Sequence, residues 1–430
     1  MQKRKFTGTL ATAGAMAVSA MLASAKAEDT IKVGVLHSLS GTMAISETTL
    51  KDTVLMMVDD VNKRGGLLGK KVEAVVVDPA SNWPLFAEKA RELIEKDKVA
   101  VVFGCWTSVS RKSVLPVFEE LNGLLFYPVQ YEGEESSNNV FYTGAAPNQQ
   151  AVPAVEYLMG KEGGEAKRWV LEGTDYVYPR TTNKILEAFL KSKGVAAEDI
   201  MINYTPFGFS DWQTEVAAIK KFASAGKKTA VVSTINGDAN VPFYKELANQ
   251  GIKASDIPVV AFSVGEEELS GIDTKNLLGH LAAWNYFESV KNPTNAAFIK
   301  QWHAFIKNDK RVTNDPMEAT YIGFKMWSHA VVQAGTTEVN AVRQAMYGQK
   351  VQAPSGFVAV MNTNHHLSKP VMIGEIQPDG QFEVVWQTKN AIKADAWSPY
   401  LPEDKGKVAD WSFPWVCGNC TEPKYKTLVN

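Results

Sequence analysis

The sequence predicts an α/β protein of two lobes, each a doubly wound parallel sheet, joined by several hinge crossovers. Three observations predict this fold. Short apolar runs alternate with amphipathic segments at helical spacing, which is the pattern of parallel strands covered by helices on both faces. The alternation pauses near residue 148 and then begins again, so it describes two similar halves. The chain has 430 residues, and a chain of this length usually folds around more than a single hydrophobic core.

The first half alternates strands and helices in regular order. In the segment 47–66, for example, Val54, Leu55, Val58 and Val61 recur at helical spacing before a pair of glycines. Strands are expected at 30–38, 70–78, 99–104 and 123–128, and helices at 47–66, 83–97 and 108–122.

The second half repeats this alternation and then crosses back. Strands are expected at 168–173, 202–207, 228–235 and 257–263, and helices at 181–193, 212–226 and 241–251. The apolar segment 277–289 predicts a crossing toward the first half, followed by helices at 295–309 and 318–335. Short β segments follow, and the tail is irregular and rich in Pro and Trp. The expected division is 28–148 with 279–353 in lobe 1, and 149–278 with 354–430 in lobe 2.

Residues 1–27 have the features of a cleaved export signal. Lys3, Arg4 and Lys5 precede an apolar stretch too short to span a bilayer, and 25–27 form a small-x-small cleavage site. The mature chain is therefore expected in the periplasm, as a monomer. Removal of the signal takes away four basic residues and leaves a net charge of −6. A mildly acidic chain without basic clusters disfavours nucleic acid as a partner.

Motifs for catalysis and cofactor binding are weak. The run 65–71, "GGLLGKK", lacks residues of a phosphate loop and follows a helix, and no GxGxxG opens a helix, so no cofactor is expected. "AFSVG" (261–265) differs by one residue from the nucleophile elbow of hydrolases, so Ser263 as a nucleophile is an alternative hypothesis. The glutamates that follow would disfavour an oxyanion there. His365 and His366 lack partners at metal-ligand spacing, so neither a metal site nor catalytic residues are expected.

Cys417 and Cys420 form a CxxC pair in the irregular tail. A redox CxxC normally opens a helix after a strand, so a disulfide closing a small loop is the favoured interpretation and a zinc site the alternative. Cys105 follows an apolar strand and is expected to be a buried free thiol.

Polar and aromatic residues gather where the predicted strands end. Ligands of open α/β sheets bind outside the carboxyl ends of the strands, so these loops are expected to line a cleft. Tyr176 and Tyr178 follow one strand and lie two residues apart, which in extended chain points both rings to one side. Pro179 would preset the first turn of the next helix. We expect at least one of the two rings to contact a ligand.

Several long, unbroken stretches carry a resemblance to a known family. They include "GCWTSVS" (104–110), "YPVQYEG" (127–133), "GTDYVYPR" (173–180), "TINGDAN" (234–240) and "WVCGNC" (415–420). The chain resembles type I periplasmic binding proteins of the branched-chain amino acid and amide-receptor group, and most closely the urea-binding components of ABC-type urea transporters. The resemblance implies a protein without enzymatic activity that closes two lobes on urea and passes it to a membrane permease for nitrogen uptake.

The resemblance also implies which residues face the ligand. They are Trp106, Ser108, Val129 and Tyr131 from the first lobe, and Tyr176, Tyr178, Asp238 and Glu266 from the second. Urea is flat and neutral, so aromatic faces, donors for its carbonyl and acceptors for its four N–H groups would suit it. Short-chain amides and branched-chain amino acids are alternative ligands. An amide-sensing regulator of the same fold is an alternative function, and such a regulator should lack an export signal.

Overall fold

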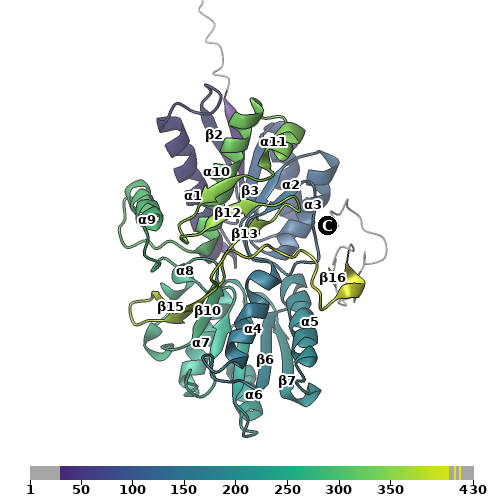
Figure 1. Cartoon of the computed structure of the whole chain (residues 1–430), viewed down its shortest axis with the longest axis vertical. Helices are drawn as coiled ribbons and strands as arrows, with labels where there is room; N and C mark the ends of the chain where they lie inside the picture. The colour runs from purple at the N-terminus through teal and green to yellow at the C-terminus, as the bar shows by residue number, and fades with distance from the viewer. Residues whose placement is uncertain (1–29, 406–410, 413–415, 418–430) are drawn as a thin grey trace, which may run out of the picture.

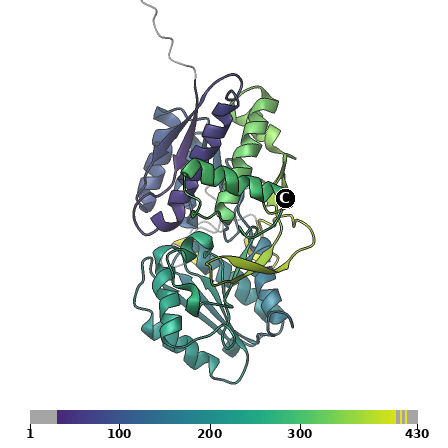
Figure 2. The ribbon, with the colours of Figure 1, turned by 90° about the vertical axis from the view of Figure 1, so that its left-hand side faces the viewer.

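The computed structural model describes residues 30–405, 411–412 and 416–417 as two lobes arranged along the long axis of the molecule (Figure 1). A side view shows each lobe as a sheet covered by helices (Figure 2). The predicted α/β fold with two doubly wound sheets is thereby confirmed.

Lobe 1 contains a parallel five-stranded sheet. Its order is β2 (Val72–Val77), β1 (Ile31–Leu36), β3 (Val101–Gly104), β4 (Leu125–Tyr127) and β5 (Val140–Tyr142). Register is set by pairs such as Val33 with Val101. The core of the lobe is aromatic: the Phe103 ring stacks on Phe126 at 5.0 Å and on Phe324 at 5.2 Å between centroids. This core holds the loops that follow the strands in place.

Lobe 2 contains a seven-stranded sheet with a mixed edge. Its order is β15 (Phe382–Gln387), β14 (Met372–Ile376), β10 (Leu281–Trp284), β9 (Val259–Ala261), β8 (Thr229–Thr234), β6 (Arg168–Thr174) and β7 (Ile200–Thr205). The β14 and β15 strands are antiparallel to their neighbours. Along β6, Val170 packs into one hydrophobic cluster, whereas Trp169 and Leu171 pack into another. Both faces are therefore buried, which explains the continuous apolar runs in the sequence.

Helices cover both sheets, and the remaining short strands form two small sheets of their own. The helices of lobe 1 are α1 (Ala44–Lys63), α2 (Trp83–Arg91), α3 (Ser108–Glu120), α9 (Pro293–Ile306), α10 (Asp315–Ala334) and α11 (Val339–Met346). Those of lobe 2 are α4 (Ala151–Met159), α5 (Val177–Ser192), α6 (Gln213–Ala223), α7 (Asn240–Asn249) and α8 (Glu266–Leu269). The smaller strands are β11 (Lys350–Gln352), β12 (Val358–Met361), β13 (Leu367–Ser368), β16 (Trp411–Ser412) and β17 (Val416–Cys417). Asn314 caps α10 by accepting from the Met317 N–H at 3.1 Å, and Gly335 ends it at φ 65°.

The strand pairing departs from the expected division of the chain at two places. The expected boundary at 278/279 put β10 in lobe 1, but β10 pairs with β9 and β14 in the sheet of lobe 2. The segment from 354 onward was expected in lobe 2, but Ala359 of β12 and Leu367 of β13 pack into the core of lobe 1. Both segments are short apolar runs, and such runs do not specify which of two similar sheets they join.

The segments 143–150, 285–292 and 369–371 cross between the lobes. One buried side chain ties them together. The Asn285 amide nitrogen donates to the Gln149 carbonyl at 2.9 Å and to the Pro370 carbonyl at 2.7 Å. Because each of these residues belongs to a different crossover, the crossovers form one hydrogen-bonded hinge.

Candidate functional site

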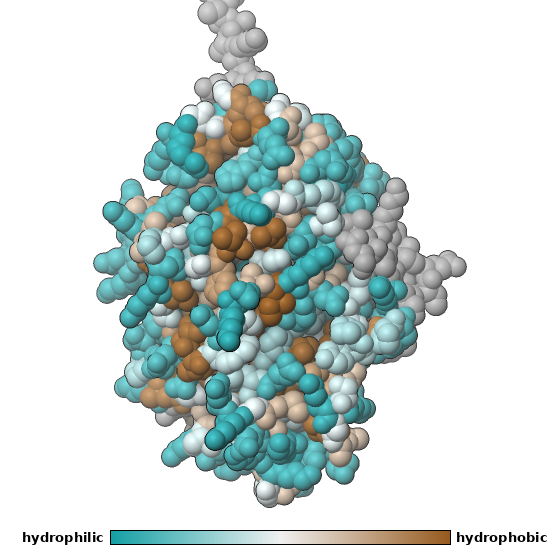
Figure 3. Space-filling model, in the orientation of Figure 1, coloured by the Kyte–Doolittle hydropathy of each residue, from teal (hydrophilic) through white to brown (hydrophobic). Residues whose placement is uncertain are grey.

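The loops at the carboxyl ends of the two sheets meet at the boundary between the lobes. Hydrogen bonds cross this boundary from Trp106 Nε1 to Asn236 Oδ1 at 3.4 Å, from Gln130 Nε2 to Ser263 Oγ at 2.8 Å, and from Ser46 Oγ to Glu268 Oε1 at 2.6 Å. The space-filling view shows the lobes in continuous contact on one face (Figure 3). The structure is therefore a closed form, and the predicted ligand positions can be judged by what they face across the boundary.

Trp106 and Ser108 lie at the lobe 1 side of the boundary, and both are buried. Cys105, directly after β3, adopts φ 66° and turns the chain into this loop. Thr107 then caps α3 by accepting from the Ser110 N–H at 3.1 Å. The turn and the cap together fix Ser108 as the first residue of α3, with its side chain against Glu132.

A buried ion-pair cluster supports this wall. The Arg111 guanidinium donates to Glu132 Oε1 at 2.9 Å and to Glu135 Oε1 at 2.8 Å, and Lys112 Nζ lies 2.7 Å from Glu135 Oε2. Burial by itself would raise the pKa of Glu135, but Arg111 and Lys112 outweigh it and hold the pKa below its ordinary value. We call these four residues the charge cluster; its two cations and two carboxylates balance in charge.

Val129 and Tyr131 occupy the loop after β4 but have different surroundings. A side chain at Gly144 would lie 2.1 Å from the Val129 carbonyl, so glycine there lets the first crossover pass close behind this loop. The Tyr131 hydroxyl donates to the Glu135 carbonyl at 3.0 Å, and its ring stacks on Tyr142 with centroids 4.9 Å apart. Tyr131 therefore packs into lobe 1, and its contact with a ligand stays a prediction.

Tyr176 and Tyr178 form the aromatic part of the lobe 2 wall. Their ring centroids are 6.2 Å apart, and Tyr176 lies 4.7 Å from the Phe207 ring. The expected helix start at 181 was late: α5 begins at Val177, so Tyr178 projects from the first helical turn. Burial raises the pKa of the Tyr178 hydroxyl, an effect partly offset by the side chains of Gln130 and Ser263. Both rings thus lie where lobe 1 approaches.

Asp238 and Glu266 lie in different parts of the boundary and differ in burial. Asp238 is exposed at the edge of the boundary, where its N–H donates to the Thr42 carbonyl at 3.3 Å. Glu266 is buried at the start of α8, and its Oε1 accepts from the Glu288 N–H at 2.7 Å. Burial raises the pKa of Glu266 well above its ordinary value. Glu266 therefore faces the segment that leads from lobe 2 to lobe 1.

The structure also brings to the boundary residues that were not predicted from the sequence to lie there. They are Arg111, Gln130, Glu132 and Asn236, together with Ser263, which the sequence suggested only as a possible nucleophile. One signal was available: Ser108 and Arg111 are three apart in a helix, which places them on one face. Gln130 and Glu132, on the loop after β4, could not be predicted in this way, because side chains in a loop do not recur at a regular spacing.

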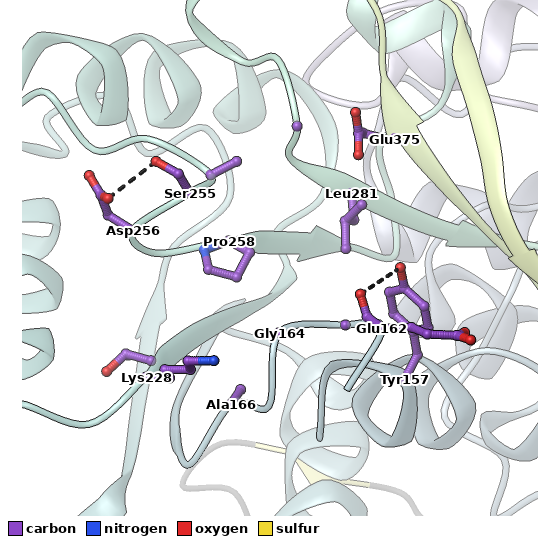
Figure 4. Close-up of a pocket in the computed structure, with 14 residues that line it drawn as sticks. Tyr157, Glu162, Gly164, Ala166, Lys228, Ser255, Asp256, Pro258, Leu281 and Glu375 are labelled. Atoms are coloured by element: carbon purple, nitrogen blue, oxygen red, sulfur yellow. Dashed lines mark hydrogen bonds between the residues drawn. The ribbon is translucent and has the colours of Figure 1, made fainter. Parts of the chain in front are cut away.

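A hollow lies at the end of lobe 2 that is opposite to the boundary between the lobes (Figure 4). Its volume is about 330 Å³, and Ala166, Thr229 and Pro258 line it at the amino ends of their strands. Since ligands of such sheets bind at the carboxyl ends, this hollow is a poor candidate for the solute site.

Other features bear on metals, membranes and disulfides. In 30–405 and the short strands beyond, no group of three His, Cys, Asp or Glu side chains could hold a metal ion. No helix in the same part of the chain is long and apolar enough to cross a bilayer. Cys105 is a buried free thiol, as expected. The predicted Cys417–Cys420 pair lies outside the part whose side chains the structure describes, and so does the signal at 1–27.

Comparison with known proteins identifies the family. The sequence model of the family described as "Periplasmic binding protein domain" matches residues 31–403, so the chain belongs to this family. The Leu/Ile/Val-binding protein homolog 7 of Brucella suis biovar 1 (strain 1330) is 24% identical over 88% of this chain and 97% of its own length. A solute-binding protein of an ABC transporter from Rhodopseudomonas palustris HaA2, in complex with p-hydroxybenzoic acid, has a TM-score of 0.73 at 21% identity, over 86% of this chain and 99% of its own.

A further match is local. A limonene hydroxylase of Geobacillus stearothermophilus is 32% identical over 121 residues, which is 28% of this chain. This chain spans only 22% of that protein's length.

Proposed function

We propose that this chain is the substrate-binding component of an ABC-type transporter, that it captures urea between its lobes in the periplasm, and that it delivers urea to a membrane permease. The observation that supports this proposal is the composition of the boundary. Aromatic rings approach it from both lobes, and two buried polar atoms there form no hydrogen bond of good geometry within the described residues: Gln130 Oε1 and the Tyr178 hydroxyl, which lies beside the Gln130 and Ser263 side chains.

Those unpaired atoms match the hydrogen-bonding groups of urea. Gln130 Oε1 can accept from a urea N–H, and the Tyr178 hydroxyl can donate to the urea carbonyl. Buried polar atoms are costly when left unpaired, so a ligand that satisfies both would stabilise the closed form. Trp106 and Tyr176 can cover the faces of a flat molecule.

Charge favours a neutral ligand over a carboxylic acid. Leucine and p-hydroxybenzoic acid, which the names of the relatives suggest, both carry a carboxylate that needs a cation or converging N–H donors. The buried guanidinium of the lobe 1 wall, Arg111, already serves Glu132 and Glu135. Short-chain amides share the neutrality of urea and are the second candidate ligands.

The small size of urea sets the expected affinity. The best tiny ligands reach about −1.5 kcal/mol per non-hydrogen atom, and urea has four such atoms, which gives roughly −6 kcal/mol. This corresponds to a Kd of tens of micromolar. Affinity near that value requires nearly every atom of urea to be buried, which agrees with a closed cleft.

Isothermal titration of the mature chain with urea, acetamide, formamide, leucine and p-hydroxybenzoate tests the proposal. We expect urea to bind most tightly and both acids to bind at least tenfold more weakly. Binding of leucine or p-hydroxybenzoate with no binding of urea would overturn the urea assignment. Acetamide binding more tightly than urea would move the assignment to short-chain amides.

The remaining parts of the proposal concern the whole protein. We propose that 1–27 is removed on export, that the mature chain acts as a monomer and that Cys417 and Cys420 form a disulfide. N-terminal sequencing, sedimentation and peptide mapping under non-reducing conditions test these three points. No catalytic step is proposed, because Ser263 accepts a hydrogen bond from Gln130 and no described histidine is its partner.

A further inference from the structure

The hydrogen bonds of Ser108 determine what this hydroxyl can offer a ligand. Its proton is directed to Glu132 Oε2, and its oxygen accepts from Arg111 Nη1 at 3.1 Å. A hydroxyl has one proton and two lone pairs, so one lone pair is left. In this arrangement Ser108 can accept from a ligand N–H but has no proton for a ligand oxygen.

The arrangement around Glu132 is rigid. Arg111 holds Glu132 at 2.9 Å and is held in turn by Glu135 at 2.8 Å. The guanidinium also lies 4.7 Å from the centroids of the Tyr127 and Tyr131 rings. Charge-assisted hydrogen bonds and contacts with aromatic faces both favour the ionised partners in this geometry. Glu132 Oε2 is therefore held in place as the acceptor of the Ser108 proton.

The negative charge of Glu132 reaches the opposite wall. Burial raises the pKa of the Tyr176 and Tyr178 hydroxyls, and the charge of Glu132 raises both further. A group that acts on both tyrosines of lobe 2 lies beside the boundary that closes on the solute. A carboxylate entering there would meet the Glu132 side chain and a Ser108 oxygen without a free proton.

We propose that Glu132 is the specificity-determining residue of the site, because it fixes Ser108 as an acceptor and thereby selects N–H-rich neutral solutes and rejects carboxylates. This inference rests on the proposed place of the solute between the lobes, and it assigns Glu132 a role distinct from that of the other carboxylate of the charge cluster.

The test compares Glu132→Gln with Glu135→Gln. Each removes one negative charge from the charge cluster, but only Glu132 contacts Ser108. Titration at pH 7 with urea, leucine and p-hydroxybenzoate is expected to show that Glu132→Gln weakens urea binding at least tenfold and strengthens binding of at least one acid at least tenfold. Glu135→Gln should leave the ratio of urea to acid affinity within about threefold of the original. Circular dichroism establishes that each variant is folded.

Ser108→Ala provides a second arm should Glu132→Gln fail to fold. The proposal expects loss of urea affinity of about tenfold without any gain in acid binding, because Glu132 remains. Acid binding gained by Ser108→Ala, or the same change of ratio in both Gln variants, would overturn the role of Glu132. If the original chain binds no urea but Glu132→Gln still gains acid binding, the urea assignment fails and the role of Glu132 stands.

Discussion

The charge cluster in lobe 1 and a buried carboxylate inside lobe 2 illustrate opposite ways of treating buried charge. In lobe 1, Glu132 and Glu135 are fully buried and paired with Arg111 and Lys112. In lobe 2, Glu172 is equally buried in β6, but its described polar partner is the Asn203 amide at 3.2 Å, and its Oε1 is unpaired. Burial accordingly raises the pKa of Glu172 to about 8, so this side chain is largely protonated at neutral pH.

The difference assigns separate tasks to the lobes. Lobe 1 presents a wall fixed by ion pairs, with hydrogen-bond directions set before a solute arrives. Lobe 2 presents neutral aromatic and amide groups, whose hydrogen bonds are completed only when a solute and lobe 1 are both present. In a closed cleft of this kind, lobe 1 would form directed hydrogen bonds with the solute, and the rings of lobe 2 would cover its surface.

The largest expected effect comes from breaking the charge cluster. Arg111→Met leaves Glu132 and Glu135 without their shared cation, and removing one partner of a buried ion pair costs about 3–5 kcal/mol. We expect a large fall in the free energy of unfolding, measured by urea-independent methods such as guanidinium or thermal denaturation. The matched control is Arg91→Met, whose carboxylate partner Glu120 is 2.6 Å away but exposed. The control should melt nearly as the original does; equal losses in both variants would contradict the account.

The next effect concerns pH and lobe 2. The pKa of Glu172 is about 8 in the folded chain and 4.5 ordinarily, so the folded state retains a proton that the unfolded state loses. Stability should therefore fall as pH rises from 6.5 to 8, by up to about 1.4 kcal/mol per unit for this group. The depressed pKa of His280, about 4 against 6.5 ordinarily, acts in the opposite direction and mainly below pH 6.5.

Glu172→Gln should remove the contribution of Glu172 to the fall of the unfolding free energy with pH. Chemical denaturation at several pH values measures this slope. Glu135→Gln should lower stability without changing the slope between pH 6.5 and 8, because Glu135 has its folded pKa below the ordinary value and is ionised in both states there. An unchanged slope in Glu172→Gln would show that the lobe 2 carboxylate is ionised after all.

A smaller effect is expected from the unpaired hydroxyl of the lobe 2 wall. Tyr178→Phe removes a donor proposed for the urea carbonyl and should weaken urea binding about tenfold, which corresponds to one hydrogen bond of about 1.4 kcal/mol. Tyr244→Phe is the matched control, since its hydroxyl is also buried and unpaired but packs within lobe 2. Titration should show unchanged affinity for Tyr244→Phe; equal losses would place the ligand elsewhere.

The smallest effect is expected at Trp106. Its hydrogen bond to Asn236 is 3.4 Å long and therefore weak, whereas its aromatic face is kept in Trp106→Phe. Titration should show urea affinity reduced less than about threefold. The exposed Asp238 offers a useful contrast, because Asp238→Ala should leave affinity unchanged although the sequence placed this residue at the ligand.

Much of the fold follows from the sequence, because buried parallel strands such as β3 and β9 are short apolar runs between amphipathic helices. The lobe to which each segment belongs was harder to predict from the sequence. Nothing in the β10 segment "LAAW" indicates which of the two sheets it joins, because its placement depends on pairing with β9 and β14. Within the candidate site, the aromatic pair in "DYVYPR" was recognisable, but the orientation of Tyr131 was not. That ring turns into lobe 1 because two other rings stack beside it. Tyr142 comes from the neighbouring strand β5, and His366 comes from a segment far away in the chain.

The most direct test of the account is a crystal structure of the mature chain grown with urea. The account predicts one urea molecule between the lobes, its carbonyl toward Tyr178, its N–H groups toward Gln130 and Ser108, and aromatic rings over its faces. Urea bound to one lobe alone, or a boundary closed as here with urea elsewhere, would contradict it.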